Sequence, residues 1–153
     1  MALNVNTILN KVISHALATG LFEDVNGHEP VNTPPSGGLS CAAWVNDLVP
    51  IRSSGMNSTS VRLEIGQRIY TSAVSEPLDA IDPAVTGAVD VLFAKYNGDF
   101  ELGGSVRQVD VFGAYGEPLR ARAGYLPVAD GPPQRVMTIV LPLICNDIWE
   151  QSA

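Results

Sequence analysis

Thiol and imidazole groups are the first candidates for chemistry in this sequence. It contains two cysteines, Cys41 and Cys145, and two histidines, His15 and His28. A zinc site needs paired ligands at short spacing, and no such pair occurs. A catalytic cysteine needs a histidine base beside it, and neither histidine lies in a context that indicates one. We therefore predict two free thiols that pack as small apolar side chains, and no metal site.

Carboxylates are the second candidates, because they recur at every third residue in Glu76, Asp79 and Asp82. Such a group could act as a general acid or hold a cation weakly. Negative charge is also favoured where a helix begins, and Asp82-Pro83 is a typical helix start. We interpret the three carboxylates as charges at the start of a helix. Because the sequence also lacks the phosphate-binding, zinc-helix and serine-hydrolase motifs, we expect no catalytic residue and no cofactor.

Length and charge exclude several classes of protein. The chain has 153 residues, 46% of them hydrophobic, which fits one domain over 1–153 at about 150 residues per domain. This content excludes a disordered chain, and no apolar run reaches the ~18–20 residues of a membrane-spanning helix. The first residues lack the basic and apolar regions of a secretory signal, so we expect none. A net charge of −7 disfavours binding to a phosphate backbone.

Two segments have the apolar spacing of helices. In the first, about residues 5–19, Asn4 or Asn6 can cap the start and Gly20 favours a left-handed end. In the second, about residues 83–97, Asp82 is the expected cap and Gly98 the expected end. The apolar stripes consist of Val5, Ile8, Leu9, Val12, Ile13, Ala16 and Leu17 in the first helix and Val85, Ala88, Val89, Leu92, Phe93 and Tyr96 in the second.

Strand-like segments make up most of the remainder. Asn26-Gly27 after the first of them is typical of a tight hairpin turn, and Pro142 in the last indicates an edge position or a bulge. Short turns between consecutive strands favour antiparallel pairing. The predicted fold is α+β, with a mixed, mainly antiparallel sheet of about 4–6 strands and two helices packed against it. The predicted strands are 21–25, 39–49, 58–70, 106–112, 119–125 and 135–145.

Two of these predicted strands differ in how many of their faces should be buried. Segment 39–49 has apolar residues on both faces, which predicts cover on both sides, and Trp44 is expected in the core. In segment 58–70, apolar residues such as Val61 alternate with charged residues such as Arg62 and Glu64. A shift by one residue would bury those charges, so we expect a well-specified register with the charged face outward.

The charges are distributed unevenly along the chain. From Glu76 to Glu101 there are six acidic residues and one basic residue, Lys95, hence a local charge of −5. Arginines, which favour bidentate pairing at interfaces, lie in or beside the predicted strands. Ordinary surface charge is one interpretation. The other is a molecule with an acidic and a basic surface, which associates head to tail and can close into a ring. The predicted subunit interface is Arg62, Arg68, Tyr70, Arg120, Arg122 and Trp149.

Six strings of residues together are similar to one protein family. The strings are Ala43-Trp44-Val45-Asn46-Asp47, Gln67-Arg68-Ile69-Tyr70-Thr71, Glu76-Pro77-Leu78-Asp79-Ala80-Ile81-Asp82-Pro83, Tyr96-Asn97-Gly98-Asp99-Phe100-Glu101-Leu102-Gly103-Gly104, Val106-Arg107-Gln108-Val109-Asp110 and Arg135-Val136-Met137-Thr138-Ile139-Val140-Leu141-Pro142-Leu143-Ile144. With these strings the sequence resembles, over about residues 1–150, the tail terminator (tail completion) proteins of phages with long non-contractile tails.

The resemblance implies a structural protein with an α+β fold and no enzymatic activity. Its expected partners are copies of itself in a hexameric ring, the tail tube protein and the head–tail connector protein, without a membrane. The implied ring caps the tail tube, ends its polymerisation and joins it to the connector. Its location would be the head-proximal end of the tail in the virion, after assembly in the host cytoplasm.

DNA would touch such a ring only in passage through its lumen. A basic wall would hold phosphates, so the wall should be acidic or neutral. Two alternatives remain open: another neck or head–tail connector protein (a stopper or adaptor), and a small ligand-binding or enzymatic α+β domain. The residues predicted for the lumen or an acidic surface are Glu76, Asp79, Asp90, Asp99 and Glu101.

Overall fold

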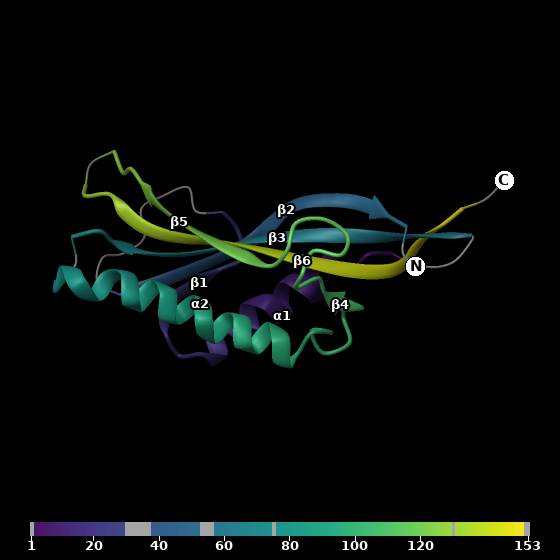
Figure 1. The fold of residues 1–153 in the computed structure, drawn as a ribbon, viewed down its shortest axis with the longest axis horizontal. Coiled ribbons are helices and arrows are strands. Elements are labelled where there is room, and N and C mark those ends of the chain that lie inside the picture. The colour runs from purple at the N-terminus through teal and green to yellow at the C-terminus, as the bar shows by residue number, and fades with distance from the viewer. Residues whose placement is uncertain (1, 30–37, 53–56, 75, 130, 152–153) are drawn as a thin grey trace.

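The computed structural model has two helices on one side of a six-stranded sheet (Figure 1). It describes residues 2–29, 38–52, 57–74, 76–129 and 131–151. None of the helices in these ranges is long and apolar enough to cross a membrane. The elements in chain order are α1 (Val5–Ala18), β1 (Phe22–Asn26), β2 (Leu39–Ile51), β3 (Ser58–Ser72), the 3-10 helix η1 (Leu78–Ala80), α2 (Ile81–Gly98), β4 (Gln108–Val109), β5 (Arg120–Leu126) and β6 (Gln134–Glu150).

The sheet has the strand order β1-β2-β3-β6-β4, and β5 pairs with β6 beside β4. All pairs are antiparallel except β1 with β2. The predicted α+β fold with a mixed, mainly antiparallel sheet is confirmed. The predicted hairpin at Asn26-Gly27 is wrong, because β1 runs parallel to β2. A parallel partner needs a long connection, and residues 27–38 provide one.

The two helices begin in different ways. Asn4 caps α1 by accepting a hydrogen bond from the Thr7 amide at 3.1 Å, and Gly20 with φ 69° follows the helix, as predicted. Helix α2 begins at Ile81, without a side-chain cap. The predicted Asp82 cap is therefore wrong. Its carboxylate instead accepts a hydrogen bond from Arg135 Nε at 2.9 Å, which ties the start of α2 to β6.

The core lies between the helices and the inner face of the sheet. Apolar residues on alternate positions of β3, from Val61 to Ile69, are fully buried there, as the alternation predicts. Gln67 interrupts this row, but its polar groups are paired: it accepts a hydrogen bond from Tyr96 of α2 and donates to Cys41 Sγ at 3.4 Å. A buried polar group is tolerated when it is hydrogen-bonded, so the core keeps one polar triad.

The outer face of β3 does not point into solvent, contrary to the prediction. Arg62 and Glu64 are only 5% and 6% exposed. The loop between β4 and β5 covers them from the side opposite the helices, and Arg62 Nη2 donates to the carbonyl of Glu117 at 2.7 Å (Figure 1). This cover comes from a residue 55 positions later in the chain, so periodicity within β3 contains no signal for it.

Strand β6 is longer than predicted and lies inside the sheet, so the predicted edge position or bulge at Pro142 is wrong. The carbonyl of Pro142 accepts a hydrogen bond from the Asp110 amide at 2.9 Å. In an antiparallel strand the N and O atoms of one residue point to the same side. The nitrogen of Pro142 therefore points away from β3, to the side where β6 pairs first with β5 and then with β4. Because it does not point to β3, the β3–β6 ladder loses no hydrogen bond.

Candidate interaction surfaces

The residues predicted for the subunit interface do not form one patch. On the outer face of β3, Arg62 is buried and lies 3.2 Å from Glu64, while Tyr70 is 3% exposed and packs with Ala42 and Val136. Burial raises the pKa of the Tyr70 hydroxyl. Both side chains are therefore occupied by contacts within the chain, and little of either is accessible.

Arg68 lies next to them and stacks on an aromatic ring. Its guanidinium lies 5.1 Å from the centroid of Trp44, and its Nε donates to Thr138 Oγ1 at 3.2 Å. Glu29 adds a long ion pair at 3.9 Å. Trp44 is only partly buried, so the prediction that it lies in the core holds in part: it covers Gly66 on the outer face, under the guanidinium.

Arg120, Arg122 and Trp149 are the predicted interface residues that lie at the surface. Arg120 and Arg122 both belong to β5 at an edge of the sheet. Arg120 Nη2 lies 3.2 Å from Glu117, whereas Arg122 forms no salt bridge with another described residue. Trp149 is 43% exposed near the end of β6, opposite Thr59 of β3, so it belongs to the sheet. Whether these residues contact another copy stays a prediction.

The residues predicted for the acidic surface extend along α2 instead of gathering in one cluster. Glu76 and Asp79 precede the helix, Asp90 lies on its exposed side, and Asp99 and Glu101 follow it. A helix of 18 residues spans about 27 Å, so the two ends of this row are far apart. The row is a stripe of negative charge, and its lining of a lumen stays a prediction.

Asp99 has the most specific contacts in this stripe. It accepts a hydrogen bond from the Gly103 amide at 2.9 Å, and its Oδ2 lies 2.9 Å from His15 Nε2 of α1. The amide of Gly103 first, and His15 second, lower the pKa of the Asp99 carboxyl below its usual value. Asp99 thus joins the two helices, a structural role that the sequence did not predict.

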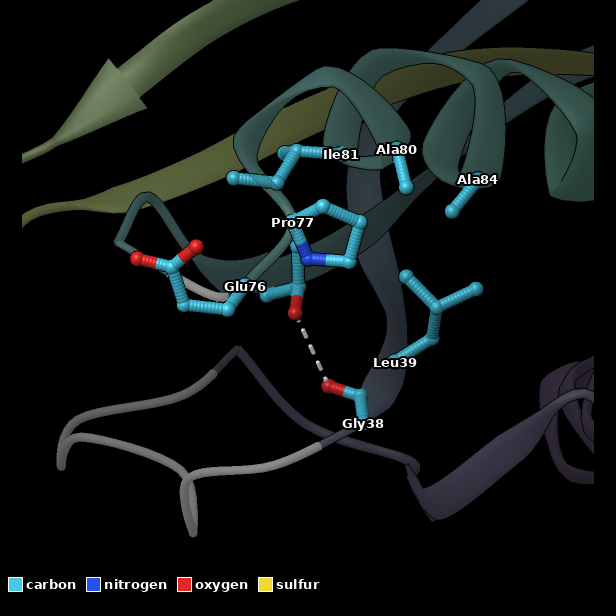
Figure 2. Close-up of a pocket in the computed structure, with 8 residues that line it drawn as sticks. Gly38, Leu39, Glu76, Pro77, Ala80, Ile81 and Ala84 are labelled. Atoms are coloured by element: carbon cyan, nitrogen blue, oxygen red, sulfur yellow. Dashed lines mark hydrogen bonds between the residues drawn. The ribbon is translucent and has the colours of Figure 1, made fainter.

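Two pockets bear on the ligand-binding alternative. One, of about 180 Å³, lies between the start of β2 and the start of α2. Its lining is mainly apolar, and the Glu76 carboxylate turns away from Leu39 and Ala84 (Figure 2). This volume is below the range of about 300–1,000 Å³ that is usual for small-molecule sites. A larger pocket of about 520 Å³ lies between the start of α1 and the end of β6, with Glu101 and Arg107 in its lining.

The thiols offer no nucleophile to these pockets. Cys41 and Cys145 are free and buried, as predicted. Burial raises the pKa of each thiol to about 11, so both stay protonated near neutral pH. Among the described residues, no three His, Cys, Asp or Glu side chains come together as a metal site would require.

Exposed apolar side chains are the surface feature that the sequence interpretation missed. The first half of β2 is buried and the second half is exposed, with Val45, Leu48 and Val49 as its exposed apolar side chains. The prediction that segment 39–49 is covered on both sides is therefore wrong for this half. The signal that could have found it is Asn46-Asp47, a polar pair inside the strand.

Phe112 is the most exposed large apolar residue of the described chain, at 94%. It lies in the loop between β4 and β5, which the buried carboxylate of Asp110 organises. Asp110 accepts hydrogen bonds from the amides of Ala114 at 2.8 Å and Tyr115 at 2.9 Å. The aromatic ring is thus presented on a loop with internal hydrogen bonds, an arrangement suited to contact with a partner.

Comparison with known proteins adds little to this description. No protein family model matches the chain, and no curated protein matches it. A chain in a solved structure of the virion of a native gene transfer agent (GTA) particle is similar over 89% of this chain and 90% of that chain. The TM-score is 0.37 and the sequence identity is 10%.

Proposed function

We propose that this protein is a structural component of a phage-type virion that forms a ring, of six copies, at the head-proximal end of a tail. In that position it would cap the tail tube, end polymerisation of the tube protein and bind the head–tail connector. The proposal begins from the resemblance of the six strings to tail terminator proteins. The α+β fold with two helices on one sheet face agrees with what that resemblance implies.

The structural observation that best supports the proposal is the surface of the chain, whose exposed apolar and charged side chains suit association with other proteins. Exposed apolar side chains lie on the second half of β2, at Val45, Leu48 and Val49, and on the loop between β4 and β5, at Phe112. Acidic residues lie along α2, and Arg122 of β5 is exposed without a salt bridge to another described residue. By contrast, the buried thiols are protonated at neutral pH, and the described pockets bring together no nucleophile, base and oxyanion site.

The test is made in particles that lack the protein. A phage genome that encodes the chain, with its gene interrupted, should produce tails of uncontrolled length that do not join filled heads. Supplying the wild-type chain in trans should restore uniform tails. Tails of normal length, detached from DNA-filled heads, would overturn the capping role and support a stopper or adaptor of the neck. Particles that assemble normally would overturn both structural roles.

A purified system gives an independent measurement. Tail tube protein that polymerises in vitro should form shorter tubes in the presence of the wild-type chain, because capped ends no longer grow. Electron microscopy would measure the length distribution and show whether density is added at one end only. Tubes of unchanged length would count against capping.

A further inference from the structure

The sheet has two edge strands, β1 and β5, which lie at the same position along the strand direction. Within the described ranges, β1 pairs only with β2, and β5 pairs only with β6. β5 lies opposite residues 134–140 of β6, which face residues 66–72 of β3. Residues 40–44 of β2 face residues 66–70 of β3, and β1 pairs with residues 39–42 of β2. The two edges are thus at the same end of the sheet (Figure 1).

The two edges carry opposite charges. β1 has two exposed acidic residues, Glu23 and Asp24, and no basic residue. β5 has two basic residues, Arg120 and Arg122, and no acidic residue. An unpaired strand edge is a template for pairing with another strand, and opposite charges on adjacent strands favour such a pair.

Asp24 of β1 and Arg122 of β5 also lie on the same face of the sheet. Asp24 pairs with Ser40, which pairs with Tyr70 on the outer face of β3. Arg122 pairs with Thr138, which pairs with Arg68 on that same face. In a sheet that continued from one copy to the next, Asp24 and Arg122 would therefore be on one side and within reach of each other.

Strand direction is compatible with continuation. The strands β2, β3, β6 and β5 alternate in direction, so β5 runs opposite to β2. β1 is parallel to β2 and hence also runs opposite to β5. If a neighbouring copy extends the sheet by rotation about an axis along the strands, its β5 meets β1 in the antiparallel sense, the majority arrangement within the sheet itself.

We propose that β5 of one copy pairs antiparallel with β1 of the next copy, so that the basic edge with Arg120 and Arg122 lies against the acidic edge with Glu23 and Asp24 across the subunit boundary. The partner of each edge is the opposite edge of a second copy, because two acidic β1 edges would repel each other, and so would two basic β5 edges. A contact between two different surfaces repeats from copy to copy and closes into a ring when the rotation permits. The inference rests on the proposed ring function and names the surfaces that would form the ring.

A second contact at the other end of the sheet supports this arrangement. β4 lies opposite residues 143–144 of β6, which face residues 62–63 of β3 and, through them, residues 48–49 of β2. The open half of β2, with exposed Leu48 and Val49, is therefore level with β4. Continuation of the sheet would bring this apolar edge towards β4 of the neighbouring copy and reduce its exposure to water.

Charge exchange between the edges tests the pairing. One variant carries Glu23→Arg and Asp24→Arg, a second carries Arg120→Glu and Arg122→Glu, and a third carries all four changes. The matched control, Asp79→Arg with Asp90→Arg, alters the charge of the α2 stripe as much as the first variant alters β1. Circular dichroism establishes that each full-length chain is folded, and native mass spectrometry with light scattering measures assembly.

The wild-type chain and the control should form the same closed oligomer. The first and second variants should each lose it, with at least tenfold weaker association, because both edges of each variant then have like charge. An equimolar mixture of these two variants should recover assembly with alternating copies, and the four-change variant should recover it alone. Assembly that ignores the reversals, a mixture that stays dissociated, or a wild-type chain that remains monomeric at millimolar concentration overturns the pairing.

Tube length separates this inference from the proposed function. Rings that follow the exchange pattern but do not shorten tail tubes support the strand pairing and overturn capping. Tubes that are shortened equally by the wild-type chain and by the first and second variants support capping and overturn the strand pairing.

Discussion

Tyr96 of α2 donates its hydroxyl to the side-chain oxygen of Gln67 of β3, and both side chains are fully buried. Burial raises the pKa of the Tyr96 phenol far above its usual value, so the hydroxyl keeps its proton and remains a donor. Gln67 also donates to Cys41 of β2. One hydrogen-bonded group thus connects a helix and two strands inside an otherwise apolar layer, and it fixes where α2 lies along the sheet.

Removal of the Tyr96 hydroxyl should destabilise the fold. In Tyr96→Phe the oxygen of Gln67 loses its donor in a fully buried site, which should lower the free energy of unfolding by about 1–3 kcal/mol. Urea denaturation measures the change. Tyr125→Phe is the matched control, because the Tyr125 ring is exposed and contacts Arg135 through its face. Equal stabilities of Tyr96→Phe and the control would contradict the structural role of this bond.

Both cysteines should resist alkylation in the folded protein. Burial raises the pKa of Cys41 and Cys145 to about 11, and the thiolate is the reactive form. At pH 8, iodoacetamide should therefore label the folded chain roughly 100-fold more slowly than the urea-unfolded chain. Mass spectrometry counts the labelled thiols. Rapid labelling of either cysteine in the folded protein would show that the thiol is accessible and ionised.

Asp99 should make stability depend on acidic pH. Its pKa is lowered in the folded state by the Gly103 amide and by His15. A lowered folded-state pKa stabilises the fold above the unfolded value of about 3.9, and this contribution is lost as the pH falls through the lower folded value. Asp99→Asn should therefore be less stable than the wild-type chain at pH 7, by less than about 1 kcal/mol.

The difference between Asp99→Asn and the wild-type chain should shrink as the pH falls through the lowered pKa of Asp99, because the protonated carboxyl is neutral like the amide. Thermal unfolding at pH 7, 5, 4, 3 and 2 measures it, with Asp90→Asn as a matched change on the exposed side of α2. A difference that stays constant down to pH 2 would contradict the assignment of the stabilisation to the ionised carboxylate.

Asp110 should control the order of the loop that presents Phe112. Its carboxylate accepts the amides of Ala114 and Tyr115, so Asp110→Ala leaves both amides without this acceptor. Hydrogen exchange at these two amides should become at least tenfold faster, while exchange in β3 changes little. Glu117→Ala is the matched control, because the hydrogen bonds and ion pair of the Glu117 side chain with described residues go only to Arg120. Unchanged exchange in Asp110→Ala would contradict this role.

The elements with a local signal were predictable from the sequence. The apolar spacing of α1 and the alternation from Val61 to Ile69 each reflect one buried face, and both faces are where the pattern predicts, except that Leu17 at the end of the α1 stripe is exposed. The parallel pairing of β1 was not predictable, because Asn26-Gly27 is a strong hairpin signal and pairing depends on where the long connection returns. The burial of Arg62 depends on a loop far along the chain, so no local pattern reports it.

The candidate surfaces show the same division between local and long-range signals. The charges of α2 and β5 are visible in the sequence, and the structure places them at the surface. Their grouping was not predictable. Charge and alternation predict an interface at Arg62, Arg68 and Tyr70, yet these side chains mainly form contacts within the chain. Glu23 and Asp24 matter to the inferred edge because β1 ends the sheet, a property of topology alone.

Charge reversal on the α2 stripe should impede the passage of DNA if this stripe lines the lumen of the proposed ring. Asp79 and Asp90 suit the test, because both are exposed and neither is tied into the fold as Asp99 is. In a phage that carries Asp79→Lys and Asp90→Lys, the added lysines would attract phosphates along the path of the genome.

Tails of this phage should assemble with normal length, while genome release should slow several-fold and the effect should weaken as salt rises, because counterions compete for the phosphates. Release triggered in vitro and followed with a DNA-binding dye measures the rate. Asp79→Asn with Asp90→Asn separates loss of negative charge from gain of positive charge and should release DNA almost normally. Unchanged release from the lysine variant would place the stripe outside the lumen and leave it for contact with the tube or the connector.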